Sequence, residues 1–326
     1  MKISEWLDSA TRQLRATNID SARLDAELLL THTLDTPREW ILAHIDTSLQ
    51  TANLQKLGSL LIRRLDGEPM AYILGHKEFY GRDFIVTPDV LIPRPETEQL
   101  VEMTKQAIST SRANPISPVK AGLALNRQTV DDEAKRGGDG LDERTLGETI
   151  TILDVGTGSG AIAVTLALEI PNAHIFASDV SKKALLIAKR NARILGAEKI
   201  EFIQSDLLQI ICNKPHSRQP QQFNMFDIIV ANLPYVAREW ESSLNITYEP
   251  EIALFAGDEG LELIKKLIQQ TPKHLKLGGL LILELDPRQV NAIKKFATNF
   301  NFIVLDERPF VLTLQRRCIP ETAKQK

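Results

Sequence analysis

Residues 151–169 read TILDVGTGSGAIAVTLALE, and their pattern indicates an α/β fold. TILDV has the apolar, β-branched pattern of a buried strand, and AIAVTLALE has that of a buried helix. Between them, Gly156, Gly158 and Gly160 allow a tight turn and the close approach of a ligand to the backbone. We therefore expect a strand, a glycine loop and a helix in this order, with a ligand near the loop.

Strand and helix patterns continue to alternate after this stretch. Alternation of this kind predicts an α/β domain with a doubly wound, mainly parallel sheet over residues 149–326. Such sheets bind ligands beyond the carboxyl ends of their strands. Further strands are expected at 174–178, 199–205, 226–231 and 280–285, and further helices at 182–195 and 261–275.

The N-terminal part of the chain has a different, helical pattern. Apolar residues recur at helical spacing through residues 1–75, which predicts a small helical bundle. In residues 76–108, the extended segments 83–87 and 89–92 predict a β-hairpin with Pro88-Asp89 as its turn, and Pro95 begins a helix. Residues 109–148 are rich in Ser, Pro, Gly and charged residues, so we expect a flexible insertion or linker.

Composition indicates a protein of the cytoplasm. The chain has 326 residues, 43% of them hydrophobic and 25% charged, which is close to the soluble average. A net charge of -3 and no basic stripe argue against direct nucleic-acid binding, and no apolar span suits a membrane. Cys212 and Cys318 are far apart and are interpreted as reduced thiols. The six histidines have no metal-binding spacing, so no metal is expected.

Polar groups follow three of the predicted strands. The first is the loop of Gly156, Thr157, Gly158, Ser159 and Gly160. Together with the following alanine, it also fits the GxGxxA pattern of NAD enzymes. The structural alternative is a turn that binds no ligand. Asp179 lies 23 residues beyond Gly156 and could accept hydrogen bonds from both hydroxyls of a ribose. Alternatively, it caps the following helix, although Ser181 could also do so. Asp206 is a further ligand candidate or a turn residue, and Leu207 and Leu208 could flank an adenine ring.

The fourth strand pattern, FDIIVA, is followed by NLPY, residues 232–235. NLPY resembles the [DNS]PP[YFW] motif of methyltransferases that modify amino or amide nitrogens with S-adenosylmethionine. A β-turn is the structural alternative. The resemblance narrows to the release factor glutamine methyltransferases, the HemK/PrmC family, through three longer stretches. These are GEPMAYILGHKEFYGRDFIVTPDVLIPRPETEQLV (67–101), ILDVGTGSGAIA (152–163) and YEPEIALFAGDEGLE (248–262).

The resemblance implies a Rossmann-like methyltransferase domain preceded by a helical substrate-recognition domain. The implied reaction is methyl transfer from S-adenosylmethionine to the glutamine amide in the GGQ motif of class I peptide chain release factors. Asn232 and the carbonyl of Leu233 would accept the two amide N–H groups, Pro234 would hold the loop rigid, and Tyr235 would form an aromatic wall. Asn232 would also border the cofactor.

Two residues depart from the family pattern. Leu233 stands where the family has proline, and Asp286 stands where it has glycine. Two other functions stay open at this point: a DNA adenine methyltransferase, which shares the motif chemistry, and a non-catalytic protein that binds the cofactor or a release factor.

Overall fold

The computed structural model describes residues 1–113, 149–209, 225–237 and 248–317. These residues form two compact units. The first contains Met1–Lys77, Val86–Pro88 and residues 248–249, and the second contains the other described residues. Both cysteines and the larger part of the expected linker, residues 114–148, lie outside the described residues.

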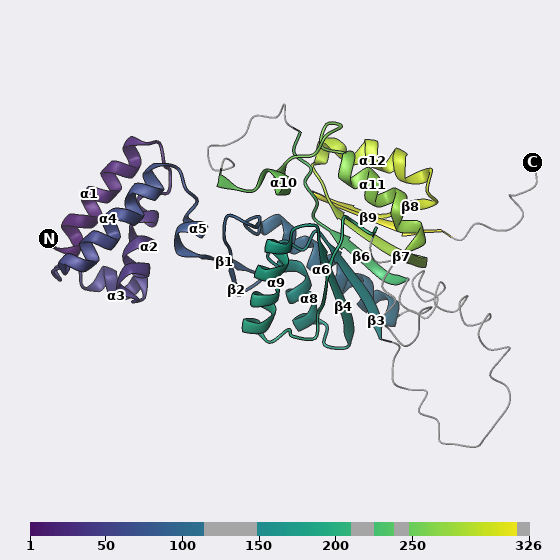
Figure 1. Cartoon of the computed structure of the whole chain (residues 1–326), viewed down its shortest axis with the longest axis horizontal. Helices are drawn as coiled ribbons and strands as arrows, with labels where there is room; N and C mark the ends of the chain where they lie inside the picture. Colours follow the sequence, from purple (N-terminus) through teal and green to yellow (C-terminus); the bar gives the residue numbers. More distant parts are fainter. Residues whose placement is uncertain (114–148, 210–224, 238–247, 318–326) are drawn as a thin grey trace, which may run out of the picture. The chain divides into compact units, whose positions relative to one another are not determined.

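The first unit is built from short helices around a common apolar core (Figure 1). Ile3, Leu7 and Leu14 lie on the buried face of its first helix, as their spacing predicts. The core also holds a buried ion pair, in which Arg64 Nε lies 2.7 Å from Asp25 Oδ2. The helices are α1 (Ile3–Ala16), α2 (Ala22–Leu34), α3 (Arg38–Ala43), α4 (Thr51–Leu65) and α5 (Met70–Leu74).

A hairpin follows, but its strands differ from those that the sequence predicted. β1 (His76–Phe79) pairs with β2 (Arg82–Ile85), so the turn is Tyr80-Gly81 and not Pro88-Asp89. Residues 89–92 are irregular, and the prediction of a strand there is wrong. Prolines at both ends of this segment lack the N–H that a strand ladder needs.

The helix expected at Pro95 is confirmed. A short 3-10 turn, η1 (Pro95–Thr97), leads into α6 (Glu98–Ala113), with acidic residues in its first turns as the helix dipole favours. Because α6 continues to Ala113, the beginning of the segment expected as a linker is helical.

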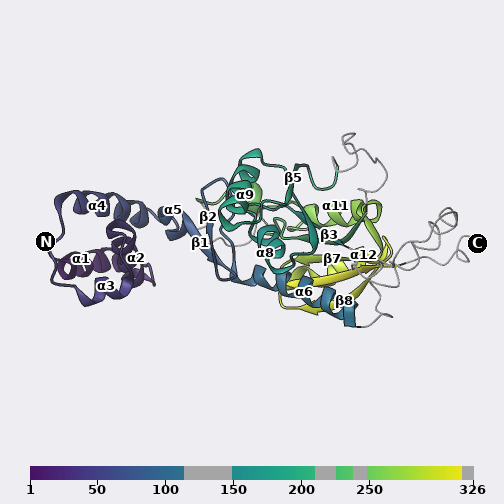
Figure 2. The same cartoon turned by 90° about the horizontal axis from the view of Figure 1, so that it is seen from below.

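The second unit contains a seven-stranded sheet, ordered β5-β4-β3-β6-β7-β9-β8 (Figures 1 and 2). The pairs from β5 to β7 are parallel, while β9 is antiparallel to both β7 and β8, so the predicted mainly parallel, doubly wound sheet is confirmed. From β3 the chain continues to β4 and β5 on one side of the sheet, and β6 and β7 lie on the other side. The topological switch point is therefore between β3 and β6. The strands are β3 (Ile150–Val155), β4 (Ala173–Asp179), β5 (Glu201–Gln204), β6 (Phe226–Ala231), β7 (Leu275–Glu284), β8 (Phe302–Arg308) and β9 (Val311–Arg316).

Helices cover both faces of this sheet. Successive residues of β3 point to opposite faces, so that Ile152 packs in a core with α6 and α8, and Leu153 packs in a core with α11 and α12. Both cores are closely buried, which fixes the ends of the strands in space. The helices and 3-10 turns are α8 (Ala161–Glu169), α9 (Lys182–Leu195), α10 (Glu251–Leu254), α11 (Glu262–Gln270), η3 (Thr271–Lys273), η4 (Pro287–Gln289) and α12 (Val290–Thr298).

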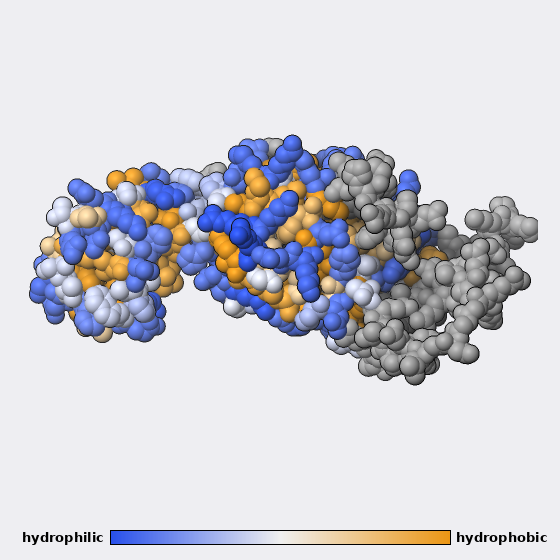
Figure 3. Space-filling view, turned by 60° about the horizontal axis from the view of Figure 1, so that its bottom comes forward, coloured by the Kyte–Doolittle hydropathy of each residue, from blue (hydrophilic) through white to orange (hydrophobic). Residues whose placement is uncertain are grey.

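Hydrophilic and hydrophobic groups are mixed over the visible surface of each unit (Figure 3). Within the described ranges, no helix combines the length and the apolar character needed to cross a membrane.

Candidate functional site

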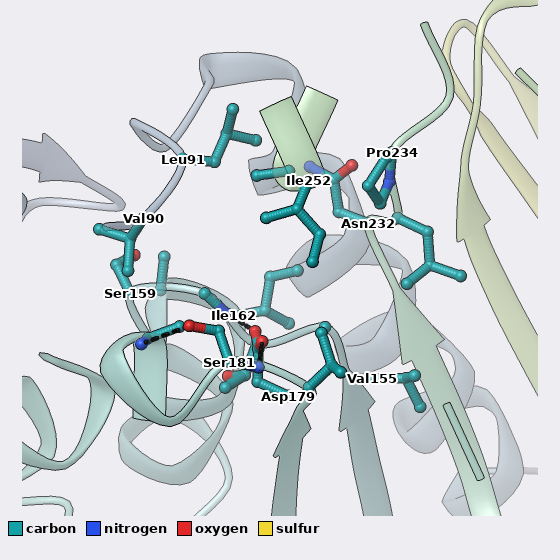
Figure 4. Close-up of a pocket in the computed structure, with 18 of the residues that line it drawn as sticks. Val90, Leu91, Val155, Ser159, Ile162, Asp179, Ser181, Asn232, Pro234 and Ile252 are labelled. Carbon is teal, nitrogen blue, oxygen red and sulfur yellow. Dashed lines mark hydrogen bonds between the residues drawn. The ribbon is translucent and has the colours of Figure 1, made fainter. Parts of the chain in front are cut away.

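A pocket of about 310 Å³ lies in the second unit at the carboxyl ends of its parallel strands. Figure 4 shows Val155, Asp179 and Asn232, which belong to or follow neighbouring strands and border the same space. All of the residues that the sequence assigned to the site line this pocket, except Gly160, Leu208 and Tyr235. The ones that line it are Gly156, Thr157, Gly158, Ser159, Asp179, Asp206, Leu207, Asn232, Leu233 and Pro234.

Hydrogen bonds hold the glycine loop against both neighbouring elements. The backbone N–H groups of Gly156 and Thr157 donate to the Ser178 carbonyl of β4 at 2.8 and 2.9 Å. Asp154 Oδ2, beneath the loop, accepts from Thr157 Oγ1 at 2.7 Å and from the Ala163 N–H at 3.2 Å. The loop is therefore preorganised by β3, β4 and α8.

Asp154 is fully buried, and sequence reasoning assigned it no role. Burial raises its pKa to about 7, against the hydrogen bonds from Thr157 and Ala163, and the nearby Asp179 charge raises it further. Its second oxygen, Oδ1, has no hydrogen-bond partner among the described residues. With a pKa of about 7, Asp154 loses its proton near neutral pH, so the charge beneath the glycine loop depends on pH.

Asp179 ends β4 and fixes the loop from the other side. Its carboxylate accepts from the Gly158 N–H at 2.9 Å and from the Ser181 N–H at 2.8 Å. Burial is the main cause that raises its pKa, and the backbone hydrogen bonds oppose it. Ser181 caps α9 by accepting from the Ala184 N–H, so Asp179 is not needed as the cap.

Asp206 and Leu207 follow β5 and line the pocket together. Asp206 is exposed, and its carboxylate accepts from Gln209 Nε2 at 3.1 Å. Leu207 is buried with φ of 50°, which is rare for a branched side chain and marks a sharp turn. Leu208 points into the core and does not line the pocket, so the prediction that both leucines flank a ligand fails for Leu208.

Gly160 serves packing instead of lining the pocket. It is the N-cap of α8, and a Cβ at this position would lie 3.1 Å from the Cβ of Ala188 in α9. Its lack of a side chain therefore allows the two helices to approach closely.

The NLPY segment leaves β6 beside the glycine loop. Asn232 is half-buried, and its Nδ2 donates to Thr97 Oγ1 at 3.0 Å. Leu233 is only 5% exposed, and its Cδ2 lies 2.9 Å from the place that a Cβ on Gly156 would occupy. The side chain of Leu233 thus fills space that Gly156 leaves open.

Tyr235 does not line the pocket, where an aromatic wall was expected. It packs against the core that contains residues of α11 and α12, and its hydroxyl donates to Glu284 Oε1 at 3.2 Å. Gln289 Nε2 donates to the Tyr235 carbonyl at 2.8 Å and to the Glu259 carbonyl at 2.9 Å. The backbone after the motif is therefore held from outside the pocket.

Sequence reasoning also missed several walls of the pocket. The irregular segment 89–93 and Thr97 form one side, and the exposed Ile252 of α10 lies near Asn232 (Figure 4). These residues lie in stretches that carried the family resemblance, but they have no chemistry that marks a site. Asp286, in place of the family's glycine, has φ of -67° and caps η4 through Arg288, so this position does not require glycine.

The charges around Glu284 shift its pKa and that of Tyr235. Glu284 is 1% exposed, and burial raises its pKa to about 7, while hydrogen bonding from Thr97, Tyr235 and Asn232 lowers it. Burial and the neighbouring Glu284 carboxyl raise the pKa of Tyr235. Tyr235 therefore keeps its proton at neutral pH. In the described part of the chain, no group of three His, Cys, Asp or Glu side chains could hold a metal ion.

Comparisons with known proteins agree with this arrangement. Two family descriptions match the chain: PrmC N-terminal domain over residues 5–75, and Methyltransferase domain over residues 146–301. A release factor glutamine methyltransferase of Koribacter versatilis (strain Ellin345) is 37% identical over 311 residues, which cover 93% of this chain and 94% of the relative. The release factor glutamine methyltransferase of Escherichia coli (strain K12) is 36% identical and covers 90% of each chain.

A bifunctional methyltransferase of Rickettsia conorii is 36% identical over 295 residues. The match covers 89% of this chain but 52% of that relative, so the chain spans about half the length of the bifunctional protein. The two release factor glutamine methyltransferases match over 94% and 90% of their own length. The chain therefore belongs to the release factor glutamine methyltransferase family.

Proposed function

We propose that the protein transfers a methyl group from S-adenosylmethionine to the side-chain amide nitrogen of the glutamine in the GGQ motif of class I peptide chain release factors. The observation that carries this proposal is that the glycine loop, Asp179 and Asn232 border one pocket. A cofactor on the loop would thus lie next to a hydrogen-bond acceptor for an amide. Membership of the family over most of the chain supports the same reaction.

The residues present fit S-adenosylmethionine. A Cβ on Gly158 would meet no atom within 4 Å, so the loop presents open backbone to a ligand. The Asp179 carboxylate would accept from the ribose hydroxyls, and Leu207 would contact the adenine ring, with the exposed Asp206 beside it. When bound, the cofactor supplies an electrophilic methyl group.

Asn232 and Leu233 would position the substrate. An amide nitrogen is a weak nucleophile because its lone pair is delocalised into the carbonyl. The Asn232 side-chain oxygen and the Leu233 carbonyl would accept its two N–H groups and hold the nitrogen in line with the methyl group. Pro234 would restrict the loop, and Tyr235 would support it from behind. The proton leaves the methylated nitrogen after transfer, so no general base is required.

Mass spectrometry of a full-length class I release factor, incubated with the protein and S-adenosylmethionine, tests the proposal. We expect one added methyl group on the peptide that contains the GGQ motif. A release factor with glutamate in place of that glutamine is the matched control and should stay unmodified. Methylation of adenine in DNA, or cofactor binding without any methylation of the release factor, would overturn the proposal.

A further inference from the structure

Four polar side chains form a connected cluster at the edge of the pocket, and two of them, Thr97 and Asn232, line it. Thr97 comes from η1, Asn232 and Tyr235 follow β6, and Glu284 ends β7. Asn232 and Thr97 are 135 residues apart in the sequence and share a hydrogen bond of 3.0 Å. Thr97 and Glu284 are 4% and 1% exposed, so water does not readily replace the partners of either side chain.

The protons in this cluster can be placed one by one. The Asn232 Nδ2 group donates to Thr97 Oγ1, so the single hydroxyl proton of Thr97 must be directed to another acceptor. The Glu284 carboxyl is the neighbouring acceptor, because hydrogen bonding from Thr97 lowers its pKa. The Asn232 amide also lowers the pKa of Glu284 in this way, so its second N–H group faces the same carboxyl. Tyr235 donates to Oε1 of the same carboxyl at 3.2 Å. Glu284 Oε2 is buried and has no hydrogen-bond partner among the described residues, so it can accept the Thr97 hydroxyl proton when that hydroxyl rotates.

This order of donors and acceptors fixes which end of the Asn232 amide faces Thr97. With Nδ2 committed to Thr97, Oδ1 is the end that is left to accept a proton from a ligand. A rotated amide would present its own N–H groups to the N–H groups of a substrate amide, and no hydrogen bond could form.

We propose that Thr97 and Glu284 are positioning residues that act through a hydrogen-bond relay, Asn232 to Thr97 to Glu284, to turn the Asn232 side-chain oxygen toward the substrate amide. This inference rests on the proposed function. In this proposal, neither Thr97 nor Glu284 contacts the methyl group or the glutamine. Their effect on rate comes from the orientation of Asn232.

The relay favours an ionised Glu284, because a carboxylate only accepts hydrogen bonds, whereas a protonated carboxyl also has a proton of its own to donate. Its surroundings set the pH at which this occurs. Burial and the charge of Glu96 raise the pKa of Glu284, and hydrogen bonding from Thr97, Tyr235 and Asn232 opposes them, which gives a pKa of about 7. Below this pH, a protonated Glu284 can donate to Thr97 and reverse the relay. The rate of methyl transfer should therefore fall as the pH decreases through this range.

A matched pair of Thr97 variants tests the relay. Thr97→Val keeps the size of the side chain and removes the hydroxyl, while Thr97→Ser keeps the hydroxyl. At saturating release factor and cofactor, we expect Thr97→Val to lower kcat by roughly 10-fold to 100-fold, the scale for a misplaced reacting group. The Kd for S-adenosylmethionine should change by a smaller factor than kcat, because the methyl group stays in place while the orientation of Asn232 is lost. Thr97→Ser should be at least about tenfold faster than Thr97→Val.

Glu284→Gln tests the far end of the relay. It should lower kcat by a similar factor and abolish the decrease in rate at low pH. The double variant with Thr97→Val should be about as slow as Thr97→Val alone, because both changes break one chain of hydrogen bonds. Equal kcat values for Thr97→Val and Thr97→Ser, or an unchanged pH profile in Glu284→Gln, would overturn the relay.

A measurement that does not depend on activity separates this inference from the proposed function. In protein labelled with ¹⁵N-asparagine, the side-chain NH₂ signals of Asn232, assigned by their loss in Asn232→Asp, report the bond to Thr97. Slow exchange and a shifted proton should occur in the parent and in Thr97→Ser, and disappear in Thr97→Val. If the parent methylates no release factor, the proposed function fails, and these signals still decide whether the relay exists.

Discussion

Asp179→Ala tests the cofactor site most sharply, because this carboxylate has defined partners and borders the pocket. In the parent, it accepts from the Gly158 and Ser181 N–H groups, and each of its oxygens can accept a further hydrogen bond. The variant removes both the proposed acceptor for the ribose and one fixed point of the loop. Asp179→Asn keeps the shape and one acceptor oxygen, so its effect should be intermediate.

The expected loss of cofactor affinity follows from the hydrogen bonds that Asp179→Ala would remove. Removal of charge-assisted bonds to the ribose should cost about 1 to 3 kcal/mol of binding free energy, or about 5-fold to 150-fold in Kd. Loss of the hydrogen bonds from the Gly158 and Ser181 N–H groups should lower stability, and removal of a carboxylate whose charge burial disfavours should offset part of this loss. We expect the melting temperature without cofactor to shift by less than about 4 °C.

Isothermal titration with S-adenosylmethionine measures Kd for the parent and the variants. Asp306→Asn, on β8 and outside the pocket, is a matched control that should bind as the parent does. NADH should bind to none of them. Unchanged affinity in Asp179→Ala, or tight binding of NADH by the parent, would refute the assignment of Asp179 to the ribose.

Three further changes address the loop and the NLPY segment. Leu233→Pro should raise kcat about twofold to fivefold, since proline restricts Asn232 and the carbonyl at 233, but should lower stability by about 1 to 2 kcal/mol because a buried side chain is lost. Asp154→Asn should remove a pH dependence of stability that denaturant unfolding can measure. The pKa of Asp154 is raised from 3.8 to about 7, so its contribution is full below pH 3.8 and is lost as pH rises through 7, by about 2 to 3 kcal/mol between pH 5 and pH 8. Gln289→Ala leaves the carbonyls of Tyr235 and Glu259 unpaired, and should lower the unfolding free energy by about 2 kcal/mol or more and slow methyl transfer.

Each of these expectations can fail independently. A Leu233→Pro protein that is slower than the parent would show that leucine is the better residue in this chain. Equal pH dependence of unfolding in the parent and in Asp154→Asn would mean that this carboxyl is ionised at all pH values tested. If the Gln289→Ala protein has the stability and the rate of the parent, Gln289 does not hold the Tyr235 backbone in place.

The parallel sheet and the strand-end residues could be predicted because they depend on local patterns. The apolar runs of β3 and β6 identify buried strands, and chain order places the residues after them at one edge of the sheet. Gly156, Asp179 and Asn232 were found in this way. The family resemblance added the chemistry of the NLPY segment.

The remaining parts depend on packing between distant residues. Thr97 and Glu284 are recognisable only once η1 and β7 bring them to Asn232 and Tyr235. The hairpin was misplaced because the apolar residues of 89–92 have a strand pattern, while the flanking prolines and the pocket hold them in an irregular conformation. For Gly160, the loop pattern indicated a ligand contact, whereas its neighbour is Ala188.

The central claim is that Asn232 presents a release factor glutamine to a methyl group on the glycine loop. Single-turnover transfer from methyl-labelled S-adenosylmethionine to an intact class I release factor, measured for the parent and for Asn232→Ala, tests it most directly. We expect the parent to label the glutamine of the GGQ motif, and Asn232→Ala to transfer the methyl group at a rate lower by roughly a hundredfold or more, with cofactor affinity nearly retained. Equal rates for the two proteins, or a parent that binds the cofactor and leaves this glutamine unlabelled, would contradict it.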